Sequence, residues 1–270
     1  MNRIAALFVT SCFLLSEGVG AETSSTEPAG TGSVFRDCDA CPEMVVIPSG
    51  IFEPGSKTSR AKRDSDKGSQ IQVDVRSFAL GRTEVTQGQW KVVMGRNPSR
   101  FSECGDDCPV ERVSWKDAQE FIRRINAMTG KVYRLPSNVE WEYACQAGKA
   151  TRYCGGEQIY EVAWYETNSK RTTHLVASKR PNAWGLYDMT GNVWEWTQDC
   201  DSAKSQSGSN TGNVSDLSGC KKHSLRGGSW GSFQQLAQTA QRSRSSSKNR
   251  AYDVVSRRSD FGLRLAATLP

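Results

Sequence analysis

The nine cysteines are the residues of this sequence most able to do chemistry, and eight of them form closely spaced pairs beyond the apolar N-terminal stretch. The pairs are Cys38/Cys41, Cys104/Cys108, Cys145/Cys154 and Cys200/Cys220. An even number of cysteines in an exported chain predicts disulfide bonds, and the spacing favours pairing each cysteine with its neighbour. Zinc held by the first two pairs is the alternative, but an oxidising compartment disfavours the free thiolates that zinc requires.

The first residues have the pattern of an export signal. Arg3 is positively charged, residues 4–15 are largely apolar, and residues 19–21 form a small-residue cleavage site. The apolar run is too short to span a bilayer, and no other segment is long and apolar enough. A lipoprotein signal is the alternative, because residues 9–12 loosely fit a lipidation box that ends at Cys12. The sequence therefore predicts a periplasmic or secreted protein without a transmembrane segment.

The rest of the chain reads as one folded domain. We expect a signal peptide over residues 1–21, a flexible linker rich in Ser, Thr and Gly over 22–33, and a domain over 34–270. An apolar fraction of 37% and a charged fraction of 24% are typical of globular proteins. A net charge of +6 permits an acidic ligand without requiring one.

Local patterns predict the elements that would position functional residues. Residues 44–47 read as a strand, and Ile71, Val73 and Val75 alternate with polar residues as in a half-buried strand. Capping boxes at residues 86–89, 114–117 and 137–140 predict three helix starts, the second followed by the longest helix. Residues 201–218 read as a polar excursion closed by a Cys200–Cys220 bridge. The composition of these segments favours an α+β fold with much irregular structure.

Seven segments, in order, resemble the formylglycine-generating-enzyme family, also called the sulfatase-modifying factors. They are 44–50 (MVVIPSG), 84–90 (EVTQGQW), 109–115 (PVERVSW), 133–144 (YRLPSNVEWEYA), 185–196 (GLYDMTGNVWEW), 226–230 (RGGSW) and 261–264 (FGLR). The resemblance covers about residues 41 to 267. It implies the α+β formylglycine-generating-enzyme fold, with a C-type-lectin-like core and little regular secondary structure.

The resemblance also implies a structural calcium site. Its ligands would be the side chains of Asp188 and Glu195 and the backbone carbonyls of Gly191 and Val193. Calcium binds several hard oxygens, which a tight turn between two carboxylates can supply. The alternative is a turn in which Asp188 only caps backbone amides. The family's second calcium site is not expected, because residues 164–169 form too short a segment.

The copper chemistry of the family is not expected in this chain. Family members that oxidise a sulfatase cysteine bind copper through two cysteines just after the Gly-Gly-Ser-aromatic motif, where this chain has Ser232 and Ala237. Copper(I) requires soft sulfur ligands, so we predict no copper and no formylglycine generation. A branch of sulfoxide synthases uses a histidine cluster for iron, but His174 and His223 lie far apart in this sequence.

Two functions therefore remain, and both use the surface near Ser229, Trp230, Ser232 and Arg242. One is a maturation enzyme for a peptide or peptide-derived substrate, like the family's periplasmic protein that oxidises the chromophore of the siderophore pyoverdine. The other is a non-catalytic module that binds a ligand or protein, as in the family's diversified members. The basic, Ser-rich stretch 231–260 suits an anionic ligand, unless it is a solvated loop with Arg242 and Arg264 in structural ion pairs. No nucleic-acid motif is present.

Overall fold

A computed structural model of the chain describes residues 32–54, 72–149, 151–200, 220–238 and 252–269. The predicted signal peptide, most of the linker, Ile71 and the 201–218 excursion lie outside these residues. Gly32 and Ser33, placed in the linker from sequence, already pair with Val46 through backbone hydrogen bonds of 2.9 and 3.0 Å. The ordered backbone therefore includes the last two residues of that predicted linker.

The three capping boxes start three helices, as predicted. The side chains of Thr86, Ser114 and Ser137 each accept a hydrogen bond from the backbone N–H three residues on. In return, the backbone N–H of each donates to the side chain of that later residue. The helices are α1 (Gln87–Met94), α2 (Trp115–Thr129) and α3 (Asn138–Gln146), followed by a short α4 (Ile159–Val162). The turns η1 (Ser102–Cys104) and η3 (Gln234–Ala237) are 3₁₀ helices.

The strands are short and come from the whole length of the chain. They are β1 (Val34–Phe35), β2 (Met44–Ile47), β3 (Gly50–Phe52), β4 (Val73–Val75), β5 (Phe78–Gly81), β6 (Tyr133–Arg134), β7 (Trp194–Cys200), β8 (Lys222–Arg226), β9 (Tyr252–Asp253), β10 (Phe261–Leu263) and β11 (Ala266–Thr268). The α+β class predicted from sequence is confirmed.

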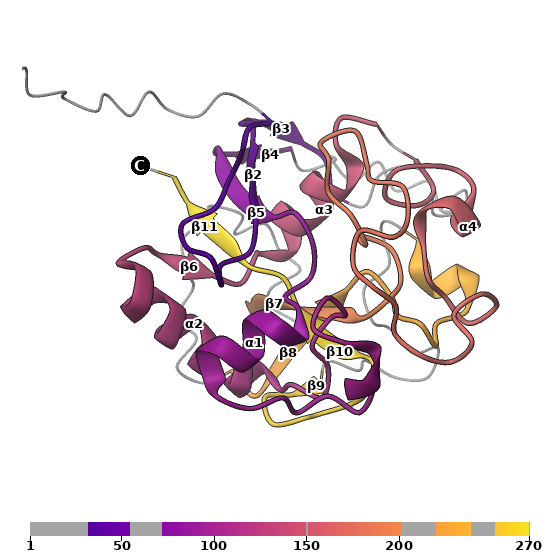
Figure 1. Cartoon of the computed structure of the whole chain (residues 1–270). Coiled ribbons are helices and arrows are strands. Elements are labelled where there is room, and N and C mark those ends of the chain that lie inside the picture. The colour runs from indigo at the N-terminus through magenta and orange to yellow at the C-terminus, as the bar shows by residue number, and fades with distance from the viewer. Residues whose placement is uncertain (1–31, 55–71, 150, 201–219, 239–251, 270) are drawn as a thin grey trace, which may run out of the picture.

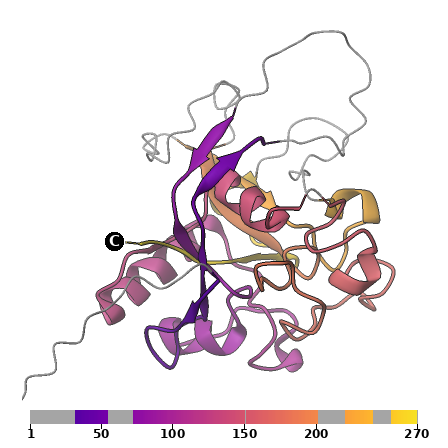
Figure 2. The ribbon, with the colours of Figure 1, turned by 90° about the horizontal axis from the view of Figure 1, so that it is seen from above.

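The described strands form three sheets. The end of the chain contributes a strand to each of the two larger ones, and β3 and β4 form the third. The larger sheet has the order β1-β2-β5-β11-β6, so β11 lies between strands from the first half of the sequence. All four residues of β2 and of β5 are buried. The second sheet has the order β10-β7-β8-β9, with β10 parallel to β7. Helices pack around the sheets, while the loops of residues 151–193 occupy one side of the molecule (Figures 1 and 2).

The parallel pairing of β10 with β7 depends on one glycine. Gly262 faces Glu195 across the two strands. A Cβ at this position would lie 2.7 Å from the carbonyl oxygen of Val110 and 2.7 Å from Cγ2 of Val193. Only a residue without a side chain lets β10 approach this closely.

All eight cysteines of the four pairs form the neighbour disulfides predicted from their spacing. The zinc alternative is therefore wrong, because sulfurs joined to each other are not available as thiolate ligands. Among the described residues, no helix is long and apolar enough to cross a membrane.

Candidate functional site

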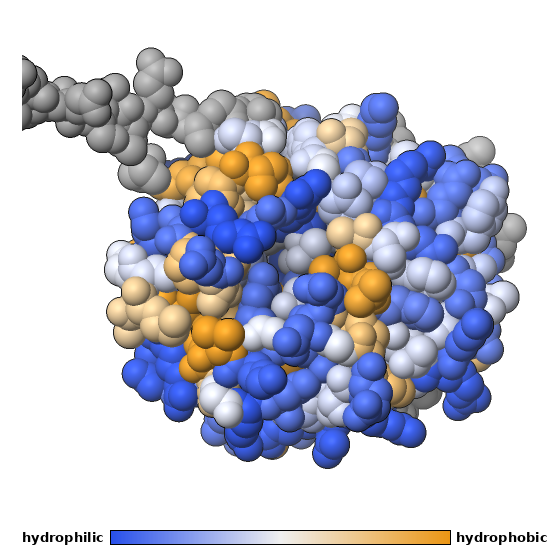
Figure 3. All heavy atoms as spheres, in the orientation of Figure 1, coloured by the Kyte–Doolittle hydropathy of each residue, from blue (hydrophilic) through white to orange (hydrophobic). Residues whose placement is uncertain are grey.

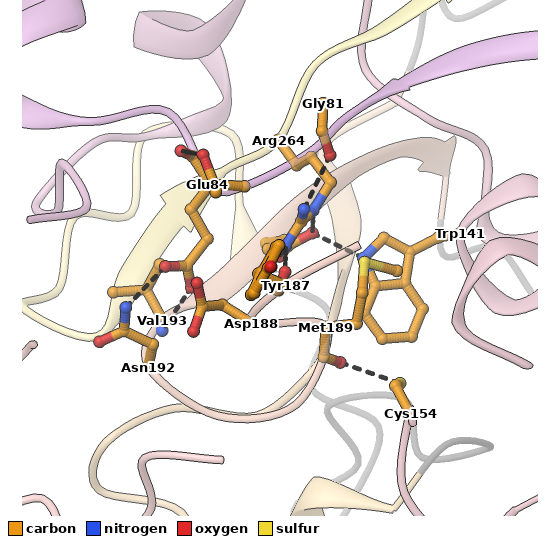
Figure 4. Close-up of polar contacts among 12 residues, drawn as sticks. Gly81, Glu84, Trp141, Cys154, Tyr187, Asp188, Met189, Asn192, Val193 and Arg264 are labelled. Atoms are coloured by element: carbon orange, nitrogen blue, oxygen red, sulfur yellow. Dashed lines mark hydrogen bonds and ion pairs between the residues drawn. The ribbon is translucent and has the colours of Figure 1, made fainter. Parts of the chain in front are cut away.

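A buried cluster of charged residues joins the two sheets (Figure 4). Arg264, which lies between β10 and β11, makes contacts of 2.7 to 3.1 Å with both carboxylate oxygens of Glu195 on β7. Neither side chain has any exposed surface. Arg264 also donates to the carbonyls of Gly81 and Tyr187. The structural pairing of Arg264, one alternative from sequence, is confirmed, and it ties the C-terminal strands to the centre of the fold.

Two further carboxylates lie in this cluster without a salt-bridge partner among the described residues. Glu84 accepts hydrogen bonds from the side chain of Asn192 and the backbone N–H of Val193. Burial and the charges of Asp188 and Glu195 raise the pKa of Glu84 well above its usual range. Asp188 accepts a 2.7 Å hydrogen bond from the N–H of Ala177, and burial raises its pKa to about 6.

The predicted calcium ligands fit this cluster only in part. Asp188 is buried and has no salt-bridge partner among the described residues, so its carboxylate suits a hard cation. Glu195 does not suit one, because Arg264 holds both of its oxygens and the indole N–H of Trp141 donates to one of them at 2.6 Å. Within the described ranges, no group of three or more His, Cys, Asp or Glu side chains is arranged to hold a metal ion. Calcium binding through Asp188, Gly191 and Val193 stays a prediction.

The turn after β8 carries three of the four residues predicted to bind substrate. Gly227 and Gly228 have φ of +95° and +85°, and this left-handed backbone reverses the chain before Ser229. Ser229 and Ser232 are both buried and contact each other, with 2.9 Å between the Ser229 nitrogen and Ser232 Oγ. These two hydroxyls stabilise the turn through their hydrogen bonds within it. Arg242, the fourth predicted residue, lies outside the described residues.

Trp230, in the same turn, is half-buried. Its backbone N–H donates to Asn192, its indole N–H donates to the carbonyl of Ser259, and its carbonyl accepts from Ser169. The ring of Phe101 packs edge-on against it, with centroids 5.4 Å apart. Because contacts hold it on several sides, Trp230 forms a rigid wall.

This wall borders a pocket of about 320 Å³. Loops that are distant in sequence form it, and its lining residues are Glu166, Arg171, Trp230, Gly231, Phe233, Arg258, Ser259 and Asp260. We call it the Trp230 pocket. Its described walls combine two aromatic rings with two acidic and two basic side chains, and they contain no histidine or cysteine. This composition suits binding of an amphipathic ligand.

The profile of the Sulfatase-modifying factor enzyme 1-like domain matches residues 31–269. The chain belongs to the sulfatase-modifying factor family. Among curated proteins, it is 32% identical over 237 residues to the chaperone protein LppX of Paenibacillus barcinonensis, covering 68% of this chain and 78% of that protein. It is also 32% identical to the formylglycine-generating enzyme of Bos taurus, covering 66% of this chain and 64% of that enzyme.

Solved structures of the family share the fold. PvdO from Pseudomonas aeruginosa superposes with a TM-score of 0.75 at 28% identity, covering 90% of this chain and 100% of PvdO. Variable protein 1 of Treponema denticola superposes with a TM-score of 0.70 at 26% identity, covering 88% of this chain and 99% of that protein. The family resemblance read from the seven segments is confirmed.

The copper-binding positions of family oxidases do not fit copper in this sulfatase-modifying factor relative. Ser232 contacts the turn through its hydroxyl, and Ala237 is buried with a methyl group that packs against Gly228. A hydroxyl oxygen is a hard donor and a methyl group is none, whereas copper(I) is held by sulfur. The donor set therefore contradicts a copper site at this turn.

The two histidines lie in separate, well-packed places. His174 stacks on Trp164, and its ring nitrogen lies 2.8 Å from the carbonyl oxygen of Ser169. His223 stacks on Trp115, and burial lowers its pKa. Both rings therefore have structural partners.

Sequence reasoning missed the two charged loop residues of the Trp230 pocket, Glu166 and Arg171. They belong to a segment without a family motif, and only the tertiary fold brings them to residues 258–260. Glu84 lies in a segment that was recognised, but its burial beside Asp188 was not foreseen. The feature of the sequence that could have indicated this burial is the position of the carboxylate directly before the apolar Val85.

Proposed function

We propose that this protein is an exported member of the sulfatase-modifying factor family that binds a peptide or peptide-derived ligand in the Trp230 pocket, without copper-dependent cysteine oxidation. The observation that carries the proposal is the pocket itself. A rigid indole and the exposed ring of Phe233 stand beside four charged side chains, a combination that suits an amphipathic segment.

Export is part of the proposal. The N-terminal sequence has the pattern of a signal, and four disulfides are typical of proteins that fold in oxidising compartments. A periplasmic or secreted location would give the pocket access to peptides and to exported proteins. Similarity to a protein named as a chaperone, LppX, supports a binding role.

A peptide array tests the binding function. Purified protein with a fluorescent label is applied to synthetic hexapeptides of varied sequence, and the experiment is repeated with Phe233→Ala and Trp230→Ala. We expect both variants to lose most of the signal. Tyr160→Ala is the matched control, because Tyr160 is an exposed aromatic residue that does not line the pocket. Equal binding by wild type and Trp230→Ala would reject the proposed site.

The absence of cysteine oxidation has its own test. Incubation with copper and a peptide that carries the sulfatase motif should yield no aldehyde, with a copper-loaded formylglycine-generating enzyme as the positive control. Aldehyde formation by the purified protein would contradict the assignment of Ser232 and Ala237 to the copper-binding positions.

A maturation enzyme for a peptide-derived substrate, as in siderophore chromophore maturation, is the second candidate. It is favoured by the similarity to PvdO over the whole of that chain. The two candidates differ in whether the ligand changes. Mass spectrometry of array peptides after incubation in air would show a protein-dependent change in mass for an enzyme and unchanged masses for a binding protein.

A further inference from the structure

The charges that line the Trp230 pocket are not all neutralised. Arg258 and Asp260 form an ion pair with 2.9 Å between Nε and Oδ1, and the same guanidinium lies over the ring of Phe261. Arg171 makes no ion pair with any residue in the described part of the chain. Among the described residues, the carboxylate of Glu166 receives a single hydrogen bond, of 3.3 Å, from the hydroxyl of Thr167. One cation and one anion of the pocket are therefore left to a ligand.

The backbone that carries Arg171 is held in an unfavourable conformation. Lys170 and Arg171 have φ of +54° and +61°, a left-handed region that costs roughly 1 kcal/mol for each residue with a side chain. Two successive residues of this kind persist only where other contacts impose them. Other contacts must therefore hold the backbone of Arg171, whose side chain is exposed, in this conformation.

Ser169 contacts both the backbone that carries Arg171 and the turn that carries Trp230. Ser169 is fully buried, and its hydroxyl accepts a 3.1 Å hydrogen bond from the N–H of Arg171. The same hydroxyl donates to the carbonyl of Trp230 at 2.7 Å. A single buried side chain therefore links the backbone of Arg171 to the backbone of Trp230, two residues that line the pocket.

We propose that Arg171 is the anion-recognising residue of the Trp230 pocket and that the ligand is an acidic peptide, which places a carboxylate on Arg171 and an apolar side chain against Trp230 and Phe233. The guanidinium can donate two parallel hydrogen bonds to a carboxylate. Phe233 is 62% exposed and offers the apolar contact. Glu166 in the same pocket repels a doubly charged phosphate more strongly than a singly charged carboxylate, which favours the carboxylate. The inference rests on the proposed binding function.

Paired peptides test the inference. Hexapeptides with one aromatic residue are made in a glutamate and a glutamine version, and dissociation constants are measured by fluorescence anisotropy at low and high salt. We expect wild type to bind the glutamate version about fivefold more tightly at low salt, with the preference reduced at high salt. Arg171→Gln should bind both versions equally, whereas Arg171→Lys should keep part of the preference because it keeps the charge.

Lys170→Gln is the matched control. It removes the same charge from the neighbouring residue, which has the same backbone conformation and does not line the pocket. It should keep the wild-type preference, and circular dichroism should show all variants folded. A preference that survives Arg171→Gln, or wild type that does not distinguish the versions, would overturn the role of Arg171 while leaving the pocket in place. If Trp230→Ala leaves binding of both versions unchanged, or if no peptide binds, the proposed function itself is wrong.

Discussion

Glu111 offers a direct test of how burial sets a pKa and, through it, the pH dependence of stability. Its side chain has no exposed surface, and one carboxylate oxygen accepts a 2.7 Å hydrogen bond from the N–H of Phe101. The other oxygen has no hydrogen-bond partner among the described residues. Burial raises the pKa of Glu111 to about 7 from its usual 4.5, although the N–H groups of Phe101 and Arg100 and the charge of Arg112 act in the opposite direction. The ring of Phe101 in turn supports Trp230.

The sign of the resulting pH dependence follows from the raised pKa. The folded state keeps the proton of Glu111 to higher pH than the unfolded state does. Its stabilising contribution is therefore complete below about pH 4.5 and is lost as the pH rises through about 7. A difference of two to three pKa units corresponds to about 3 kcal/mol. Asp188 and Glu84 also have raised pKa values and act in the same direction, so the wild-type dependence alone does not isolate Glu111.

Glu111→Gln removes this one titration. The new amide leaves a buried N–H group in place of the oxygen without a partner, which lowers stability by about 1–3 kcal/mol at every pH. The free energy of unfolding of the variant minus that of wild type should nevertheless increase by about 3 kcal/mol between about pH 4 and about pH 8.5. The test therefore uses the change of this difference with pH, because the constant loss of stability does not report on the titration of Glu111.

Denaturant unfolding with intact disulfides, followed by tryptophan fluorescence, measures this difference. Glu103→Gln is the control, because Glu103 is exposed and close in the chain, and it should follow the pH dependence of wild type. A difference between Glu111→Gln and wild type that stays constant within about 1 kcal/mol over this pH range would refute the reasoning.

Three further predictions test the core. Arg264→Met leaves the carboxylate of Glu195 buried without its cation and should lower the free energy of unfolding by about 3–5 kcal/mol. Arg124→Met, on the exposed surface of α2, should change it little, and denaturant unfolding measures both. Calcium should give a heat of binding in calorimetry that Asp188→Ala abolishes, and binding that survives this change would remove Asp188 from the site. Gly262→Ala should lower the free energy of unfolding by about 2 kcal/mol or more, because its Cβ would meet Val110 and Val193. Gly231→Ala, where the new Cβ has open space, should be tolerated, and thermal unfolding of both variants measures the difference.

The face of the molecule shown in Figure 3 has apolar and polar areas side by side. On the face in Figure 3, orange apolar patches are separated by blue hydrophilic surface. The exposed apolar side chains are distributed over several elements, including Ile51, Val92, Tyr160 and Phe233. Phe233 differs from the others named here because it lines the Trp230 pocket.

Several features of the fold could be predicted from sequence because their causes are local. The capping boxes at Thr86, Ser114 and Ser137 need only residues three positions apart. The disulfides join cysteines separated by 3 to 20 residues, so pairing neighbours was a sound expectation. Seven segments in a fixed order identified the family without any knowledge of contacts.

The candidate site was predicted less well, because long-range contacts decide the role of each residue. Ser229 and Ser232 look suitable for chemistry in the sequence, but the turn between them makes their hydroxyls contact each other. Arg171 has no motif around it and becomes part of a pocket because its loop packs beside Trp230, which Ser169 contacts from 61 residues earlier in the chain.

The stretch from Asp188 to Glu195 shows most clearly which properties the sequence determines and which the tertiary structure decides. Its sequence alone determines a tight turn between two carboxylates, which is a reasonable cradle for calcium. Only the tertiary structure decides that Arg264, 69 residues away between the final two strands, holds Glu195. Among the described residues, Asp188 and Glu84 are left buried without a salt bridge, and burial raises the pKa of both. The reason is physical: spacing along the chain defines which ligands a segment offers, but burial and the charges brought next to them decide which ligands remain available.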